Sequence, residues 1–266
     1  MSALLSKSIL SITGLLLLLI SCTPKEKKQE TETAKDETLI SYSIAKLFPH
    51  DRTAYTQGLV IEKGRLFEST GQAGSWIAEV NLGTGVHDKK VILDVKYFGE
   101  GITILNNKIY QLTWQNKIGF IYDVHTFKKL GEFPYEHEGW GITHDGKQLI
   151  VSDGTNVIHF KDTVSLKDVH MIIVKDKEGV VKNLNELEYI EGYIYANQWQ
   201  TNNIYKIDPA TGEVVGKLDL SELGEKVRVT DPQADVLNGI AYEKKSKLLL
   251  ITGKQWPATY AIRISK

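Results

Sequence analysis

The chain has 266 residues, of which 42% are hydrophobic, and its 32 basic and 33 acidic side chains leave a formal net charge of −1 at pH 7. A chain of this length and composition can bury a full hydrophobic core. The charge balance argues against a protein that binds nucleic acid or a membrane surface through bulk positive charge, so we expect no nucleic-acid partner.

Residues 1–21 have the features of a cleaved export signal. One lysine near the start is followed by a leucine-rich run of signal-peptide length, and the run ends at Cys22, the only cysteine in the sequence. Residues 19–22, LISC, resemble the lipobox of bacterial lipoproteins, in which cleavage before the cysteine allows its acylation. The sequence therefore predicts an exported protein, lipid-anchored through Cys22 at the bacterial cell envelope, on its periplasmic or its outer surface. A stray cysteine in an ordinary signal peptide is the alternative.

Residues 22–38 are predicted to form a disordered tether. The stretch TPKEKKQETETAKDET is highly charged and contains no aromatic side chain. Acylation of Cys22 would consume the only thiol, so no disulfide could form. Packing alone must then stabilise the folded domain, which we expect over residues 39–266.

Five units with one plan follow each other in the folded domain. Each unit has a polar or aromatic residue, a small residue that is usually glycine, an apolar strand, a turn and a second apolar strand. The units begin at intervals of 40 to 53 residues, and their first residues are Gln57, Glu100, Trp140, Asn185 and Asn238. Four-stranded propeller blades repeat every ~40 to 50 residues. The sequence therefore predicts an all-β fold, a five-bladed β-propeller with four antiparallel strands per blade.

An irregular β-sandwich is the alternative fold, but sandwiches lack a repeated five-unit plan. The last unit stops near Lys266 after its third strand, whereas residues 39–48, LISYSIAKLF, form a strand that precedes the first unit. We expect this amino-terminal strand to complete the last blade and to cover an edge that would otherwise pair with other chains. Only SELGEKVRV, residues 221–229, is expected to contain helical turns, and Trp76 is expected in the core.

The propeller topology brings the candidate site residues to one face. The connection into the first strand of each blade and the loop between its second and third strands lie on the same side, so ten segments converge on one mouth. Among the five unit-starting residues only Glu100 can ionise, and the loops add Trp114, Trp199, Asp153 and Lys254. One carboxylate, one amine and several indoles favour a small-molecule or chain-terminus site over a metal cage.

Two glycines flank the acid in the stretch FGEG. We expect Gly101 to serve blade packing, because glycine recurs at this position in four blades, and Gly99 to clear space around Glu100 for a ligand. The seven histidines show no metal-ligand spacing, and no nucleophile elbow or phosphate-binding loop is present. A non-catalytic surface propeller that binds peptide or glycan is an alternative function. A propeller lactonase is a further alternative. It would need several carboxylate and amide ligands around a catalytic divalent ion, and a ring of unit-starting residues with only one acid argues against it.

Motifs in every blade resemble the plant-type glutaminyl cyclases, also called glutaminyl-peptide cyclotransferases, which are five-bladed propellers of plants and bacteria. The matching stretches lie in order across residues 50–262 and include YTQGL, LFESTG, YFGEG, GWGIT, LNELEYI, NQWQTN, DVLNGIA and TGKQWP. The resemblance implies an enzyme that converts the amino-terminal glutamine of peptides or proteins to pyroglutamate with release of ammonia. It implies no required cofactor, leaves room for a structural calcium ion in the central channel, and is compatible with a monomer.

The resemblance also assigns the site residues. The acid of the FGEG motif, the proposed general acid/base of the family, falls on Glu100. We expect Lys254 and Asn185 to hold the γ-carbonyl oxygen of the substrate as negative charge develops. The residues expected to bind substrate are Gln57, Phe98, Trp114, Trp140, Trp199 and Tyr55. Tyr55 stands where many members have phenylalanine, so an extra hydroxyl is expected at the pocket rim.

Overall fold

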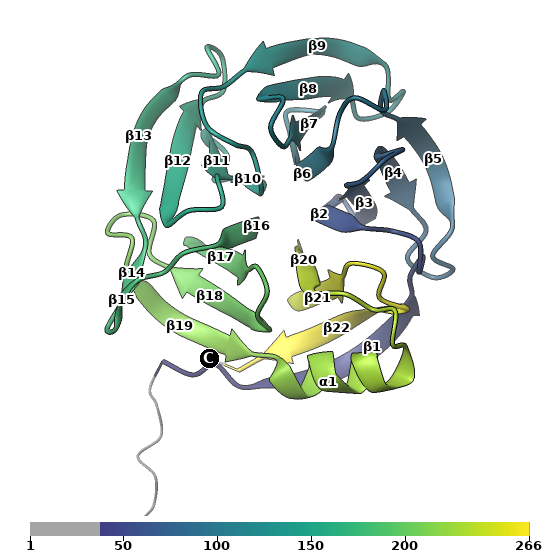
Figure 1. Ribbon diagram of the computed structural model, residues 1–266, viewed down its shortest axis with the longest axis vertical. Helices are drawn as coiled ribbons and strands as arrows, with labels where there is room; N and C mark the ends of the chain where they lie inside the picture. The colour runs from purple at the N-terminus through teal and green to yellow at the C-terminus, as the bar shows by residue number, and fades with distance from the viewer. Residues whose placement is uncertain (1–37, 266) are drawn as a thin grey trace, which may run out of the picture. The chain divides into compact units, whose positions relative to one another are not determined.

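The computed structural model describes residues 38–265. The predicted export signal, Cys22 and the tether up to residue 37 lie outside this range. The described residues form five four-stranded antiparallel sheets and one two-stranded sheet. The five larger sheets surround a common axis (Figure 1). The fold is a five-bladed β-propeller, which confirms the prediction from the repeated units.

The first four blades are meanders in which strand order follows sequence order. Blade 1 contains β2 (Thr56–Glu62), β3 (Arg65–Thr70), β4 (Trp76–Val80) and β5 (His87–Ile92). Blade 2 contains β6 (Gly99–Leu105), β7 (Lys108–Thr113), β8 (Ile118–Asp123) and β9 (Lys129–Pro134). Blade 3 contains β10 (Ile142–His144), β11 (Gln148–Ser152), β12 (Val157–Asp162) and β13 (Asp168–Ile173). Blade 4 contains β16 (Leu184–Ile190), β17 (Tyr193–Gln198), β18 (Asn203–Ile207) and β19 (Val214–Asp219).

Blade 5 is built from both ends of the domain. Its inner strands are β20 (Leu237–Glu243), β21 (Leu248–Gly253) and β22 (Ala258–Ile264), and β1 (Tyr42–Pro49) forms the outer strand. β1 runs antiparallel to β22, with Tyr42 opposite Ile264 and Pro49 opposite Ala258. The amino-terminal strand therefore completes the last blade as predicted, and it covers the edge of β22.

Two insertions interrupt the repeat. A hairpin of β14 (Lys175–Asp176) and β15 (Gly179–Val180) follows blade 3, and α1 (Ser221–Thr230) follows blade 4. The helix covers the segment for which helical turns were predicted. Its buried residues Leu223 and Val227 are four positions apart and pack into the core between blades 4 and 5. In the range 38–265, no helix is long and apolar enough to cross a membrane.

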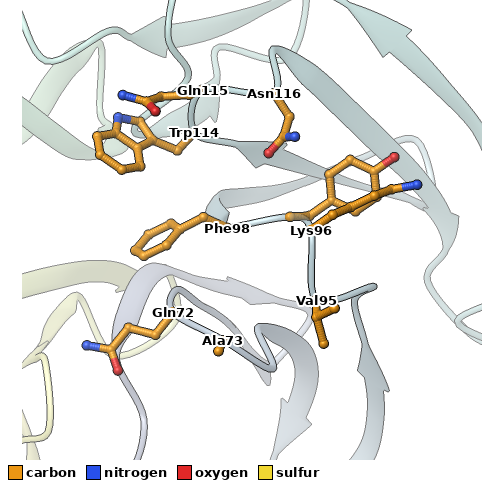
Figure 2. Close-up of a pocket in the computed structure, with 9 residues that line it drawn as sticks. Gln72, Ala73, Val95, Lys96, Phe98, Trp114, Gln115 and Asn116 are labelled. Carbon is orange, nitrogen blue, oxygen red and sulfur yellow. The ribbon is translucent and has the colours of Figure 1, made fainter.

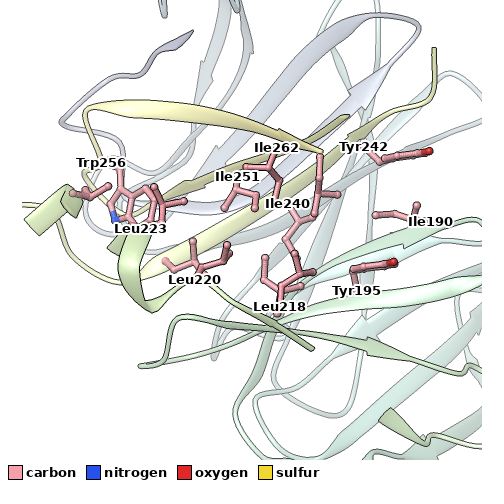
Figure 3. Close-up of a cluster of buried hydrophobic side chains, with 14 of the residues drawn as sticks. Ile190, Tyr195, Leu218, Leu220, Leu223, Ile240, Tyr242, Ile251, Trp256 and Ile262 are labelled. Atoms are coloured by element: carbon pink, nitrogen blue, oxygen red, sulfur yellow. The ribbon is translucent and has the colours of Figure 1, made fainter. Parts of the chain in front are cut away.

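The hydrophobic core is divided among the interfaces between blades. Apolar side chains form five clusters, each between two neighbouring blades. Figure 3 shows the cluster between blades 4 and 5, where Leu218 and Tyr195 face Ile240 and Ile262. Trp76 is buried in the cluster between blades 5 and 1, as expected. Because each sheet buries both faces against its neighbours, the blades stabilise one another and none has a core of its own.

The innermost strands approach each other closely at the unit glycines. A Cβ atom on Gly101 would lie 2.7 Å from the carbonyl oxygen of Trp140, and one on Gly141 would lie 2.1 Å from the carbonyl oxygen of Asn185. No side chain fits at such distances from a neighbouring main chain. These glycines therefore serve blade packing, which confirms the prediction for Gly101.

Blade 4 has a glutamate, Glu186, where the other blades have glycine. Its carboxylate accepts the N–H of Leu59 in blade 1 at 3.2 Å and the N–H of Ile240 in blade 5 at 2.8 Å. Glu188, two residues further along β16, accepts the N–H of Tyr242 in blade 5 at 3.0 Å. Burial raises the pKa of Glu186 well above its usual range and the pKa of Glu188 to about 8. The two acids tie the innermost strand of blade 4 to its counterparts in blades 5 and 1.

Candidate active site

Aromatic side chains from four blades form the rim of the predicted mouth. The ring centres of Tyr55 and Phe98 are 6.3 Å apart, and those of Phe98 and Trp114 are 5.6 Å apart. Trp140 and Trp199 meet edge to face with their ring centres 5.5 Å apart. All five side chains are half-buried. The structure thus brings together the aromatic residues that the sequence assigned to substrate binding.

Polar side chains lie deeper than this rim. Glu100 and Gln57 are each 4% exposed, Lys254 is 3% exposed and Asn185 is 2% exposed. Oε2 of Glu100 and Oδ1 of Asn185 are buried without a hydrogen-bond partner. A buried acceptor without a partner is costly in a folded protein and is explained where a ligand supplies the donor. These two atoms are therefore available to accept N–H groups of a ligand.

Burial raises the pKa of Glu100 well above its usual range. The positive charge of Lys254 and a hydrogen bond with Gln57 act in the opposite direction, while the negative charge of Glu138 raises the pKa further. Glu100 is therefore a carboxyl group whose proton equilibrium is moved toward neutral pH. Such a group can serve as both an acceptor and a donor of protons.

Asn238 determines how Gln57 is oriented. Nδ2 of Asn238 donates to the carbonyl oxygen of Thr56 at 3.0 Å and to Oε1 of Gln57 at 3.3 Å. Because Oε1 of Gln57 is the acceptor of that bond, its amide nitrogen is the end that hydrogen-bonds to Glu100. In the structure Gln57 thus positions the carboxylate, and its predicted contact with substrate stays a prediction.

Lys254 is held rigidly at the start of the loop between β21 and β22. Its backbone carbonyl accepts the N–H of Asp235 at 2.9 Å, and the indole of Trp256, two residues further, donates to the carbonyl oxygen of Asp235 at 2.8 Å. The ammonium group lies 4.5 Å from the ring centre of Tyr55. Burial lowers the pKa of Lys254, and the charges of Glu100 and Asp235 oppose this shift.

The hydroxyl of Tyr55, the departure from the family pattern, lies near the side chains of Asp235 and Gln72, and burial together with the charge of Asp235 raises its pKa. Tyr55 therefore lies between the blade 5 loop that carries Lys254 and the loop between β3 and β4 in blade 1. A phenylalanine at this position would place no hydroxyl there.

Glu138 is a site residue that the sequence analysis missed. Its Oε2 accepts the indole N–H of Trp114 at 2.7 Å and the indole N–H of Trp140 at 3.0 Å. One carboxylate thus orients two rings from different blades, and it also raises the pKa of Glu100. The sequence offered one signal for this residue, because Glu138 lies two positions before Trp140 in the connection that leads into blade 3, and this connection was predicted to lie at the mouth.

The prediction for Gly99 is wrong. A Cβ atom at this position would lie 2.5 Å from the carbonyl oxygen of Thr70 and 3.0 Å from Nε2 of Gln111. The glycine therefore makes room for protein atoms of blade 1 and of its own blade, and it clears no space for a ligand. The main chain of Glu100 is fixed by Ser69, whose hydroxyl donates to its carbonyl oxygen at 2.5 Å.

One group of described side chains, His137, His159 and Asp168, has ligand atoms close enough for a metal ion. The two imidazole rings stack with their centres 3.8 Å apart and their planes 15° apart. A metal ion binds along the in-plane lone pair of an imidazole nitrogen, and stacked rings cannot direct both lone pairs at one ion. Asp168 also accepts a hydrogen bond from Lys161. We assign no metal to this cluster.

A structural calcium ion in the central channel would need oxygen ligands. The carboxylates found there belong to Glu186 and Glu188, and every one of their oxygens already accepts an N–H or O–H group. Their burial also favours the protonated form. A structural calcium ion in the channel stays a prediction.

Comparison with known proteins agrees with this geometry. A family model described as glutamine cyclotransferase matches residues 14–264. A protein of Arabidopsis thaliana named glutaminyl-peptide cyclotransferase is 39% identical over 223 residues, which cover 82% of this chain and 70% of that protein. The crystal structure of Myxococcus xanthus glutaminyl cyclase is similar with a TM-score of 0.81 and 35% sequence identity, over 86% of this chain and 99% of that one.

Proposed function

This chain belongs to the glutamine cyclotransferase family, and we propose that Glu100, Lys254 and Asn185 perform the family's reaction at the propeller mouth. The protein is a glutaminyl-peptide cyclotransferase, which converts the amino-terminal glutamine of a peptide to pyroglutamate with release of ammonia. The observation that carries the residue assignment is the buried carboxylate of Glu100, with one oxygen unpartnered, near the buried amine of Lys254. The direct assay is ammonia release from a dipeptide that begins with glutamine.

The reaction is an attack of the α-amine on the γ-carbonyl carbon of the same residue. Nucleophile and electrophile belong to one molecule, so the site needs to fold the side chain back and to manage protons. A free α-amine titrates at about 7.7 to 8.0, so a useful fraction is neutral near neutral pH. The half-buried rings of the rim hold the folded side chain and keep water away from the γ-amide.

Glu100 accepts the proton that the amine loses as the new C–N bond forms. It then gives this proton to the γ-nitrogen as the old C–N bond breaks, so the leaving group departs as neutral ammonia. A proton shuttle of this kind contributes roughly 10² to 10⁴ in rate. The unpartnered Oε2 is the oxygen available for this task, because Gln57 holds the carboxylate in place.

Lys254 stabilises the negative charge that develops on the γ-carbonyl oxygen, and one well-placed donor is worth about 3 kcal/mol. Asn185 was expected to share this role. In the structure, however, the unpartnered buried atom of Asn185 is Oδ1, which is an acceptor. An acceptor suits a substrate N–H group, so we propose that Asn185 positions the amine or amide and that Lys254 provides the oxyanion contact.

We expect Lys254→Ala to lower kcat by about 100-fold and to change KM by less than about threefold, because the contact forms mainly in the transition state. The measurement is steady-state ammonia release, with Lys244→Ala as the matched control for losing a lysine elsewhere in blade 5. A variant that raises KM at constant kcat would show that Lys254 binds the ground state equally well and would refute the oxyanion role.

We also propose that the chain is exported and lipid-anchored through Cys22. The support is the sequence alone, since the leucine-rich run ends in LISC at the sole cysteine. Protein extracted from bacterial membranes should carry a diacylglycerol mass increment on an amino-terminal Cys22, and Cys22→Ala should abolish it. A mature protein without that increment would contradict the anchor.

A further inference from the structure

A groove adjoins the aromatic mouth between blades 1 and 2 (Figure 2). Its volume is about 420 Å³, and its walls come from residues 72–73 after β3, residues 95–98 before β6 and residues 114–116 after β7. All three segments are connections on the mouth face of the propeller. The volume lies within the range of ~300 to 1,000 Å³ that is usual for ligand pockets.

The groove is continuous with the active site. Phe98 and Trp114 line the groove, and the same two rings form the blade 2 side of the aromatic rim. In Figure 2 Phe98 points one way along the groove and Lys96 points the opposite way. The groove therefore leads from the rim of the mouth to the outer surface of the propeller.

The walls of the groove are already ordered. The indole of Trp114 donates to Glu138 at 2.7 Å, and the Trp114 N–H donates to the carbonyl oxygen of Phe98 at 3.0 Å. The ring of Tyr97 packs edge to face on Phe120 with their centres 4.9 Å apart. The Phe98 and Trp114 side of the groove is therefore preformed, which lowers the cost of ordering that wall around a ligand.

The chemistry of the groove matches an extended peptide. Its exposed apolar side chains include Ala73 and Val95, which is 80% exposed. The side-chain amides of Gln115 and Asn116, which line the opposite wall, make no hydrogen bond within the described residues. An amide offers a donor and an acceptor, which are the groups that pair with a peptide unit.

We propose that this groove binds the second and third residues of a glutamine-initiated peptide, with an apolar second side chain against Phe98, Ala73 and Val95. The inference rests on the proposed function of the mouth. Cyclisation uses only the α-amine and the side chain of residue 1, and both must face Glu100. The α-carbonyl then points out of the pocket, and the rest of the peptide must leave past the rim. Asn116 and Gln115 hydrogen-bond its main chain.

Binding energy from residues beyond the reacting one can raise kcat/KM. The enzyme should therefore turn over the tripeptide Gln-Leu-Ala-amide more efficiently than glutaminamide, which has no residue beyond the first. Replacing the second residue by glycine, as in Gln-Gly-Ala-amide, should remove most of this advantage because glycine has no apolar side chain to bury against Phe98, Ala73 and Val95.

The test is to fill the groove with Ala73→Trp. We expect kcat/KM for Gln-Leu-Ala-amide to fall about tenfold, while the value for glutaminamide changes less than about twofold. The matched control is Ala210→Trp, because Ala210 is an exposed alanine in the turn between β18 and β19, on the face opposite the mouth. This control should leave both substrates unchanged. A second variant, Asn116→Ala, should weaken only the tripeptide, by raising its KM.

Equal effects of Ala73→Trp and Asn116→Ala on the two substrates, or no effect on the tripeptide, would overturn the groove assignment. If the wild-type protein released no ammonia from glutaminamide or from the tripeptide, the proposed function would fail instead. The two failures are therefore distinguishable in the same assay.

Discussion

Glu100→Gln should lower kcat for ammonia release by a factor of roughly 10² to 10⁴, while the propeller stays folded. The amide has the shape of the carboxyl group but cannot take a proton from the attacking amine. It can still present an oxygen to the amide nitrogen of Gln57, so the local hydrogen bond survives. Removing a buried ionisable group also removes a desolvation penalty, so the melting temperature should be equal or higher.

The wild-type pH profile provides a second readout of the same group. Burial raises the pKa of Glu100 above its ordinary 4.5, and the base form must be present in the free enzyme. The substrate α-amine and Glu100 must both be deprotonated, so log kcat/KM should fall with a slope of one where the first of them becomes protonated. It should fall with a slope of two where both are protonated, and this steeper limb should begin well above pH 4.5. Glu100→Gln variants that retain activity within a few-fold of wild type would show that another group moves the proton.

The same assay tests whether the reaction needs a metal ion. The reaction replaces one amide bond with another and transfers no electrons, so we propose that no redox or organic cofactor takes part. Dialysis against a chelator should leave the wild-type rate unchanged. A loss of activity that added Ca²⁺ restores would contradict this proposal.

Gly141→Ala should be the most destabilising of the small substitutions near the site. The new Cβ atom would lie 2.1 Å from the carbonyl oxygen of Asn185 and 2.8 Å from the Cα atom of Glu186. Both are main-chain atoms of blade 4 and cannot rotate away, so β10 and β16 must separate. Overpacking typically costs 1 to 3 kcal/mol, and we expect about 3 kcal/mol here. For a domain of this size this lowers the melting temperature by about 6 to 12 °C.

The matched control is Gly131→Ala in β9. A Cβ atom there would meet no atom within 4 Å, so the melting temperature should change by less than about 2 °C. At temperatures below its own thermal unfolding transition, the Gly141→Ala variant should also lose activity, because the displaced main chain carries Asn185. Equal melting temperatures for the two variants would refute the close contact between β10 and β16.

The repeat predicted the fold because each unit contains the strand and turn pattern of a propeller blade. The extra strand at residues 39–48 and the missing fourth strand near Lys266 together implied closure, and β1 pairs with β22 as expected. The convergence of Trp114, Trp140 and Trp199 followed from topology, whereas Tyr55 and Phe98 were assigned by the family resemblance. Predicting the blades and their closure needs only the order of the strands and the alternation of apolar and polar residues along them, and both can be read from local sequence.

The sequence missed Glu138 and did not give the observed contacts of Gln57 and Gly99, because these depend on packing between blades. Glu138 lies in a connecting loop whose path the repeat does not specify, and its partners are indoles of two blades. Gln57 turns its nitrogen toward Glu100 because Asn238, far away in the sequence, occupies its oxygen. Gly99 faces Thr70 of blade 1, a neighbour that the stretch FGEG cannot reveal.

The closing pair of strands has a consequence for the order in which the molecule assembles. Tyr42 pairs with Ile264, so nearly the whole domain is the loop that this pairing must close. Contacts between distant residues form late, because the entropy of the intervening chain opposes them. Lys254 of blade 5 reaches Tyr55 of blade 1 only when the ring shuts. We therefore expect the catalytic pocket to form late in folding, after most of the individual blades.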